Sequence, residues 1–213
     1  MFDFDGVLAN SEPLHLRAYQ AVLSELGIDL DRNEYYARYL GFDDVGAFKA
    51  VGTDHRQNWT DEQVAALVAG KTRIFDAMIV SADALYPTAA ACVERLAARF
   101  PLGIASGALR HEIEAVLRSS GLDRHIRFIV ASGDTLCSKP APDPYRRAAE
   151  LHGLSPRRCI AIEDSRWGIE SARAAGLRCV GITHTYPAAE LGMADAVIES
   201  LDDFTVEMIE SLG

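Results

Sequence analysis

Apolar residues are spaced in two different ways along the chain. Between about residues 13 and 79 they recur three and four positions apart, as on one face of a helix, and no run there has the pattern of a strand. The clearest helical patterns cover 14–26, which ends at Gly27, and then 35–40, 64–68 and 74–78. This part of the chain is therefore predicted to be an inserted, all-helical domain.

From residue 86 onward, short apolar runs alternate with helical stretches. The runs cover 102–105, 128–131, 159–162, 179–182 and 196–198, and the helical stretches cover 89–98, 112–119, 144–151 and 169–175. Glycine and proline stand at the joints between them. This alternation predicts an α/β fold with a parallel, doubly wound sheet. We place this core at residues 1–12 and 82–213 and the helical insert at 13–81.

Composition narrows the class of protein. With 213 residues, of which 49% are hydrophobic, the chain can bury a substantial core and fold alone. Its net charge of -10 argues against nucleic-acid binding, which depends on Lys and Arg to neutralise phosphates. No apolar run approaches the roughly 20 residues of a membrane span, and a strand with candidate chemistry stands where a signal peptide would be. We expect a cytoplasmic protein with no membrane or nucleic-acid partner, and the sequence does not reveal its oligomeric state.

Two carboxylates lie close to the start of the chain. Asp3 and Asp5 end a short apolar run, and Gly6 then interrupts the pattern. Side chains alternate along a strand, so both carboxylates share a face, and at the carboxyl end of the strand they turn into the crevice where open α/β sheets bind ligands. A charged turn after an edge strand is the alternative. Few residues precede Asp3, although strands usually have about five or six, and the sequence leaves open whether the native chain begins before Met1.

The spacing of these carboxylates suits phosphoryl transfer. That reaction needs a nucleophile, a proton donor for the leaving oxygen, a cation and donors for the phosphate oxygens. We predict that Asp3 is the nucleophile and forms an aspartyl-phosphate. Asp5 is predicted to protonate the leaving alkoxide and then activate water, a role that needs a carboxyl whose pKa is raised by anionic neighbours.

A second acidic pair follows the apolar run 159–162. Carboxylates crowded around a dianionic phosphate need a counter-ion, and Mg²⁺ takes oxygen ligands while keeping several waters. Alternatively, Asp164 or Ser165 simply caps the helix that begins near Trp167. The predicted magnesium ligands are Asp3, the backbone carbonyl of Asp5, Asp164 and, directly or through water, Glu163.

Donors for the phosphate are predicted at two further places. Ser106 ends the run 102–105 and precedes Gly107 and a helix, so its hydroxyl and the following N–H groups can hold phosphate oxygens. A serine that only caps the helix is the alternative. Lys139 lies in the segment SKPAP at 138–142, where the prolines restrict the backbone and aim the side chain. Its charge would offset Asp3 and the phosphate, whereas most lysines are solvated surface residues.

In order, these segments resemble the four motifs of the haloacid dehalogenase superfamily. They read DFDGVL at 3–8, ASG at 105–107, SKPAPDP at 138–144 and IEDS at 162–165. With NSEPLH at 10–15, the chain is most similar to the group of beta-phosphoglucomutase and phosphoglycolate phosphatase. The resemblance implies a Rossmann-like core, a helical cap domain that closes over the substrate, and a magnesium requirement. It implies catalysis by Asp3 and Asp5, phosphate contacts from Ser106 and Lys139, and metal ligation by Asp3, Asp5, Glu163 and Asp164.

The resemblance leaves more than one function open. Dehalogenases lack the second carboxylate, so Asp5 favours phosphate chemistry. A mutase needs a cationic grip on the cap for its bisphosphate intermediate, and the loop 40–44 instead carries Asp43 and Asp44, although His15 matches a histidine of mutases. We expect a phosphatase for a small phosphomonoester such as a sugar phosphate or phosphoglycolate, with a phosphosugar mutase as the alternative. A non-catalytic binding module is least favoured because every catalytic position is filled. His15, Asp43 and Asp44 are candidate substrate contacts.

Overall fold

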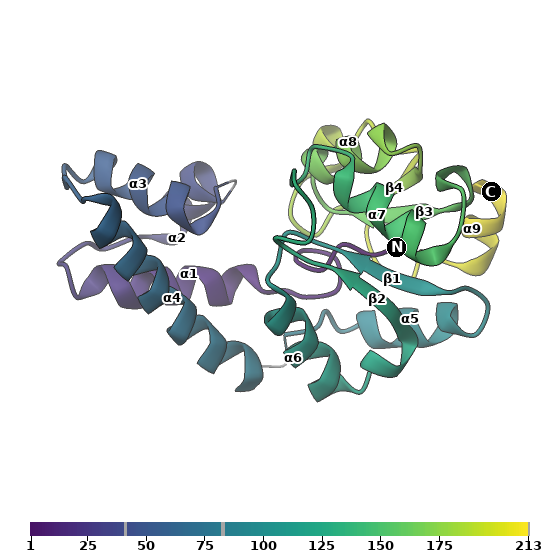
Figure 1. The fold of residues 1–213 in the computed structure, drawn as a ribbon, viewed down its shortest axis with the longest axis horizontal. Coiled ribbons are helices and arrows are strands. Elements are labelled where there is room, and N and C mark those ends of the chain that lie inside the picture. The colour runs from purple at the N-terminus through teal and green to yellow at the C-terminus, as the bar shows by residue number, and fades with distance from the viewer. Residues whose placement is uncertain (41, 82–83, 213) are drawn as a thin grey trace. The chain divides into compact units, whose positions relative to one another are not determined.

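The computed structural model of the chain describes residues 1–40, 42–81 and 84–212 (Figure 1). It divides into two compact units, Met1–Ser11 with Asp83–Gly213, and Glu12–Ala82. The first predicted boundary, after residue 12, lies one residue later than this division. The second predicted boundary, at 81–82, touches residues outside the described part.

The larger unit is built on a parallel sheet. Its strands are β1 (Leu102–Ala105), β2 (Ile126–Val130), β3 (Ile160–Glu163), β4 (Arg178–Ile182) and β5 (Ala196–Ile198). β1 pairs with β2, and β3, β4 and β5 pair in that order, all in parallel. Phe2 joins the two groups, because it forms parallel bridges to Ile104 of β1 and to Ile162 of β3. The start of the chain therefore lies in the middle of the sheet.

Helices cover both faces of this sheet (Figure 1). α7 (Asp143–His152) and α8 (Arg166–Ala174) lie on one face, while α5 (Ala89–Ala97) and α6 (Arg110–Ser120) lie on the other. α9 (Val206–Leu212) ends the unit, and short 3-10 turns occur at Asp123–His125, Pro156–Arg158 and Ala188–Glu190. The core under α7 and α8 is made of small and aliphatic side chains from the strands, around the fully buried ring of Tyr145. The predicted doubly wound α/β core is confirmed.

The smaller unit is entirely helical in its described part. It contains α1 (Glu12–Ser24), α2 (Arg32–Glu34), the π-helical turn η1 (Tyr35–Tyr39), α3 (Asp44–Asp54) and α4 (Asp61–Ser81). Leu23 of α1 and Phe48 of α3 are fully buried in its core. This is the predicted helical cap domain, and none of the described helices in either unit is long and apolar enough to cross a bilayer.

Two features of the cap domain differ from the prediction. The patterns 64–68 and 74–78 belong to one helix, α4, because the buried stripe continues between them through Lys71, which is only 2% exposed. α3 was not predicted, since two glycines and a threonine weaken its helical propensity. Burial of its apolar face around Phe48 outweighs that weakness.

Candidate active site

The carboxyl ends of the central strands gather the predicted catalytic residues. Asp3 follows Phe2, and its backbone N–H donates to the carbonyl of Ile162 at 3.0 Å. Its Oδ1 accepts from the N–H of Phe4 at 2.7 Å, which fixes the orientation of the carboxylate. Asp3 is 8% exposed. The structure thus holds Asp3 from both its backbone and its side chain.

The turn after Asp3 requires glycine. Gly6 has a φ of 73°, a conformation that side chains other than glycine rarely adopt. A Cβ on Gly6 would also lie 1.8 Å from Oδ2 of Asp164, which no packing can accept. Gly6 therefore lets the first motif approach the acidic residues that follow β3.

Asp5 has the environment of a proton donor. Burial raises the pKa of Asp5 to about 7; the hydrogen bond from Ser11 opposes this shift, and the nearby Asp3, Glu112 and Asp164 add to it. A carboxyl with a pKa near neutrality can both give and accept a proton at physiological pH. The role predicted for Asp5 is therefore compatible with its surroundings.

Lys139 forms ion pairs with two carboxylates. Its Nζ lies 3.0 Å from Oδ1 of Asp3 and 2.5 Å from Oε1 of Glu163. Burial alone would lower the pKa of Lys139, but the charges of Asp3 and Glu163 outweigh it and raise the pKa above its usual value. Its loop is anchored by the hydroxyl of Ser171, which donates to the carbonyl of Ala141 at 2.6 Å. Lys139 therefore stays charged and fixed beside Asp3.

The acidic pair after β3 completes the cluster. One carboxylate oxygen each from Asp3, Glu163 and Asp164 lie within 4.8 Å of one another. Burial raises the pKa of Asp164, and the charge of Asp3 raises it further. Burial and Asp3 also raise the pKa of Glu163, while Lys139 lowers it. Three buried carboxylates around one lysine leave an excess of negative charge. All the atoms that this cluster offers as metal ligands are oxygens, which suits a hard divalent cation.

Glu163 and Asp164 are not used to cap the next helix. Ser165 is the N-cap of α8, and its hydroxyl oxygen accepts from the N–H of Gly168 at 3.1 Å. The capping alternative therefore holds for Ser165 and is wrong for Asp164. Glu163 is fully buried, and its Oε2 has no hydrogen-bond partner among the described residues.

Ser106 and Gly107 follow β1 at the same edge of the sheet. The backbone N–H of Ser106 donates to Val130 at 2.9 Å, and its hydroxyl oxygen accepts from Ala108 at 3.2 Å. The alternative in which Ser106 caps the helix is wrong, because α6 begins at Arg110 with Leu109 as its N-cap. Gly107 is exposed, with open space where a side chain would stand.

The end of β4 adds two residues that the sequence reasoning missed. Nδ1 of His184 lies 2.9 Å from the carbonyl oxygen of Gly6, so this nitrogen carries the proton and donates. The ring of His184 stacks on Tyr86 at 3.8 Å, and Thr185 hydrogen-bonds to Asp164. Their signal in the sequence is only that polar residues follow the apolar run 179–182. They hold the first motif and Asp164 in place.

In the cap domain, two of the predicted substrate residues share a cluster with Lys71. Its Nζ lies 2.9 Å and 3.1 Å from the two carboxylate oxygens of Asp44 and 2.7 Å from Nδ1 of His15. Burial lowers the pKa of His15 to about 3, and the charge of Lys71 contributes, so the imidazole is neutral and accepts. Asp43 is exposed and instead caps α3, accepting from Gly46 at 2.7 Å. Gly41 of the same loop lies outside the described residues.

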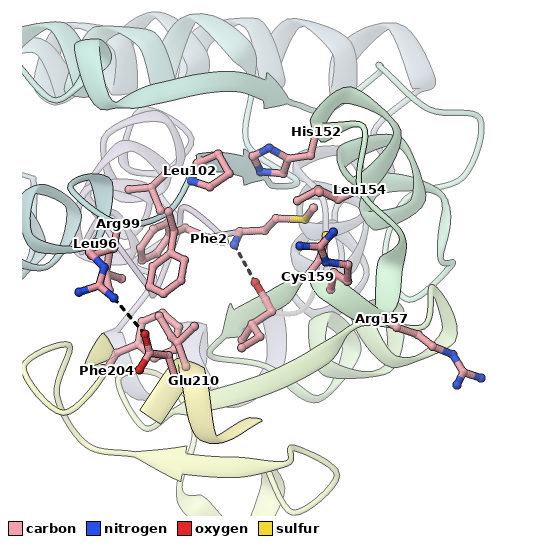
Figure 2. A pocket seen from close by; sticks show the side chains of 16 residues that line it. Phe2, Leu96, Arg99, Leu102, His152, Leu154, Arg157, Cys159, Phe204 and Glu210 are labelled. Carbon is pink, nitrogen blue, oxygen red and sulfur yellow. Dashed lines mark hydrogen bonds and ion pairs between the residues drawn. The ribbon is translucent and has the colours of Figure 1, made fainter. Parts of the chain in front are cut away.

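A separate cavity of about 520 Å³ lies at the opposite end of the sheet (Figure 2). It reaches Leu102 and Ile160, the first residues of β1 and β3, and its wall includes Phe2. Arg99 and Glu210 line the cavity and form an ion pair of 3.2 Å, drawn as a dashed line in Figure 2. Because the candidate catalytic residues follow the other ends of these strands, this cavity does not belong to the candidate active site.

The burial of Glu163 leads to a stability prediction at Gly168. A Cβ at Gly168 would lie 1.8 Å from Oε2 of Glu163, so Gly168→Ala should reduce the free energy of unfolding by about 1–3 kcal/mol. The control is Gly70→Ala in α4, where a Cβ would make an ordinary 3.6 Å contact with Val22. There we expect a gain of about 0.5–1 kcal/mol from helix propensity. Urea unfolding of both variants provides the measurement, and equal effects would contradict the packing argument.

Comparison with known proteins places the chain among its relatives. The family model of the haloacid dehalogenase-like hydrolases matches residues 1–176. Protein CbbY of Rhodobacter capsulatus is 33% identical over 222 residues, covering 100% of this chain and 97% of the relative. The fructose-1-phosphate phosphatase YqaB of Escherichia coli is 28% identical, covering 85% and 94%. The crystal structure of a CbbY mutant from Rhodobacter sphaeroides with xylulose-(1,5)bisphosphate has a TM-score of 0.79 at 27% identity, covering 94% of this chain and 92% of that one.

Proposed function

Because the chain belongs to the haloacid dehalogenase-like hydrolases, we propose that it is a magnesium-dependent phosphatase acting on a small phosphomonoester. The observation that carries this proposal is the grouping of Asp3 with Lys139, Glu163 and Asp164, with Asp5 two residues away from Asp3. A carboxylate nucleophile beside a fixed cation and a carboxyl of raised pKa is the equipment for phosphoryl transfer by way of an aspartyl-phosphate.

The proposed reaction proceeds in two half-reactions. In the first, an oxygen of Asp3 attacks phosphorus, the bond from phosphorus to the ester oxygen breaks, and the leaving alkoxide takes the proton of Asp5. In the second, Asp5 takes a proton from water, and the water oxygen displaces Asp3 from phosphorus to release inorganic phosphate. Lys139 offsets the charge of Asp3 throughout, and Ser106 with the N–H of Gly107 contacts the phosphate oxygens.

The acidic cluster fits a magnesium ion. We propose Asp3, the Asp5 carbonyl and Asp164 as its ligands, with Glu163 contributing directly or through water. When bound, the ion would neutralise the carboxylates and the phosphate oxygens. The charge excess of the cluster supports this assignment, because without a counter-ion a dianionic phosphate would meet three buried carboxylates.

Relatives suggest the class of substrate. One is named as a fructose-1-phosphate phosphatase, and another has been crystallised with a xylulose bisphosphate. We propose a phosphorylated sugar or a small phosphorylated acid such as phosphoglycolate for this chain. The test is phosphate release from a panel of these esters, with and without magnesium, and a chain that serves only as a binding module would release none.

A phosphosugar mutase is the second candidate, and His15 is the residue that favours it. The ion pair between the buried Lys71 and Asp44 argues against a mutase, because the charge of this lysine is already neutralised within the cap domain. A mutase must hold the second phosphate of a bisphosphate intermediate, and the exposed carboxylate of Asp43, at the N-cap of α3, would repel it. The charges of the cap domain therefore support the hydrolase.

This leads to a prediction that separates the two reactions. With β-glucose 1-phosphate and a catalytic amount of glucose 1,6-bisphosphate, we expect free phosphate to appear or the substrate to remain, and no glucose 6-phosphate to form. Phosphorus NMR follows both products in one sample. Rapid appearance of glucose 6-phosphate ahead of free phosphate would establish the mutase instead.

Xylulose 1,5-bisphosphate belongs in the phosphatase panel. Because the charges of the cap domain disfavour a second phosphate, we expect phosphate release from this bisphosphate to be slower than from monophosphates.

A further inference from the structure

We propose that Tyr145 is a positioning residue that restrains Glu163 and, through it, sets Lys139 against Asp3. This inference rests on the proposed phosphatase reaction, since it concerns the cation beside the nucleophile. Tyr145 lies in the first turn of α7, just after the loop that carries Lys139. One short segment therefore supplies both the lysine and the hydroxyl that restrains its partner.

The contacts form a continuous chain. The hydroxyl of fully buried Tyr145 donates to Oε1 of Glu163 at 2.6 Å, and Nζ of Lys139 donates to the same oxygen at 2.5 Å. The lysine nitrogen also lies 5.1 Å from the centre of the Tyr145 ring, within the range of a cation–π contact. Its remaining ion pair is with Asp3, at 3.0 Å. Tyr145 thus contacts both partners of the Lys139–Glu163 pair.

The hydroxyl of Tyr145 matters because the carboxylate of Glu163 is poorly solvated. Glu163 is fully buried, its Oε2 has no partner among the described residues, and both of its donors meet at Oε1. Removal of the Tyr145 hydroxyl leaves Lys139 as the one hydrogen-bond donor to Oε1 of Glu163 among the described residues, and the attraction between the lysine and this carboxylate strengthens in a water-poor site. Lys139 would then be drawn toward Glu163 and away from Asp3. The tyrosine hydroxyl keeps the lysine shared between the two carboxylates.

Tyr145→Phe tests this, since it removes only the hydroxyl. We expect kcat to fall by roughly 10- to 100-fold, as for other residues that orient a catalytic group, with KM changed by less than about threefold. The matched control is Tyr35→Phe in the cap domain, which removes a partly buried hydrogen bond from Tyr35 to a carboxylate oxygen of Glu12 at 2.9 Å. Both variants should lose comparable thermal stability, but Tyr35→Phe should keep its kcat within about twofold. Loss of kcat in both, in proportion to stability, would overturn the inference, and so would a kcat retained in Tyr145→Phe.

A double-mutant cycle with Glu163→Gln tests the route of the effect. If Tyr145 acts through Glu163, the loss from Tyr145→Phe should shrink to less than about threefold in the Glu163→Gln background. A full, multiplicative loss would show that Tyr145 acts independently of Glu163 and would refute the proposal.

A readout without turnover separates this inference from the proposed function. Beryllium trifluoride mimics a phosphorylated aspartate, and fluorine NMR measures its binding in the presence of magnesium. We expect the apparent dissociation constant to rise by about tenfold or more in Tyr145→Phe and to stay the same in Tyr35→Phe. If the parent releases no phosphate from any ester, the proposed function fails while this comparison remains decisive. Equal binding by all three proteins would refute the positioning role.

Discussion

Replacement of Asp3 by asparagine is expected to abolish phosphate release, lowering kcat by at least about a thousandfold. Asparagine has the same shape, but its amide is not a nucleophile, and the ion pair with Lys139 at 3.0 Å is lost as well. Colorimetric phosphate release at saturating magnesium measures the effect. Asp3→Asn should also prevent formation of any phosphoenzyme that is stable to acid and labile to base.

Two companion variants make this result specific. Asp123→Asn changes an exposed aspartate in the turn Asp123–His125, and it should leave kcat unchanged. Asp5→Asn should lose turnover while still trapping some phosphoenzyme, because the nucleophile is intact and only proton transfer is impaired. If Asp3→Asn retained even about a tenth of the parental activity, the assignment of the nucleophile would be wrong.

Magnesium is expected to stabilise the parent protein strongly and the Asp164→Ala variant much less. A bound ion would relieve repulsion among Asp3, Glu163 and Asp164, each of which has one carboxylate oxygen within 4.8 Å of the others. At a hundred times the dissociation constant, binding to the folded state alone adds about 2.7 kcal/mol to the free energy of unfolding. Thermal midpoints with magnesium and with EDTA measure this, and activity should be lost with EDTA.

An exposed aspartate provides the control for this experiment. Asp202→Ala removes a surface carboxylate of the same unit and should show the parental magnesium shift. Equal shifts in the parent and in Asp164→Ala would exclude Asp164 from the ligands. No shift in any of the proteins would contradict the metal site as a whole.

The strands of the core were predictable from the sequence for a physical reason. Parallel strands covered on both faces have continuous apolar runs, and the runs at 102–105 and 196–198 match β1 and β5. The others agree with β2, β3 and β4 to within two residues. α9 was not predicted, because its seven residues span only about two turns, which is too short for helical periodicity to be recognised.

The candidate site was predictable only in part. The rule that ligands bind at the carboxyl ends of parallel strands identified Asp3, Glu163 and Asp164 as neighbours, and the structure places them together. Tyr145 could not be found in this way, and the only signal for His184 was that it follows the apolar run 179–182. Tyr145 reaches Glu163 from a helix, and His184 reaches Gly6 across 178 positions of the chain. Such contacts depend on strand order and helix placement, which no local pattern reveals.

The bridging position of Phe2 has a consequence for local unfolding. Backbone bonds from Phe2 to Gly103 and from Asp3 to Ile162, at 2.9 and 3.0 Å, connect the β1–β2 half of the sheet to the β3–β5 half. The amide of Asp3 can therefore exchange with solvent only when this seam opens. Opening the seam separates Asp3, the proposed nucleophile, from Lys139 and Asp164 in the same event. The cooperativity of the sheet and the integrity of the candidate site are thus a single property, and slow amide exchange at Asp3 would report both.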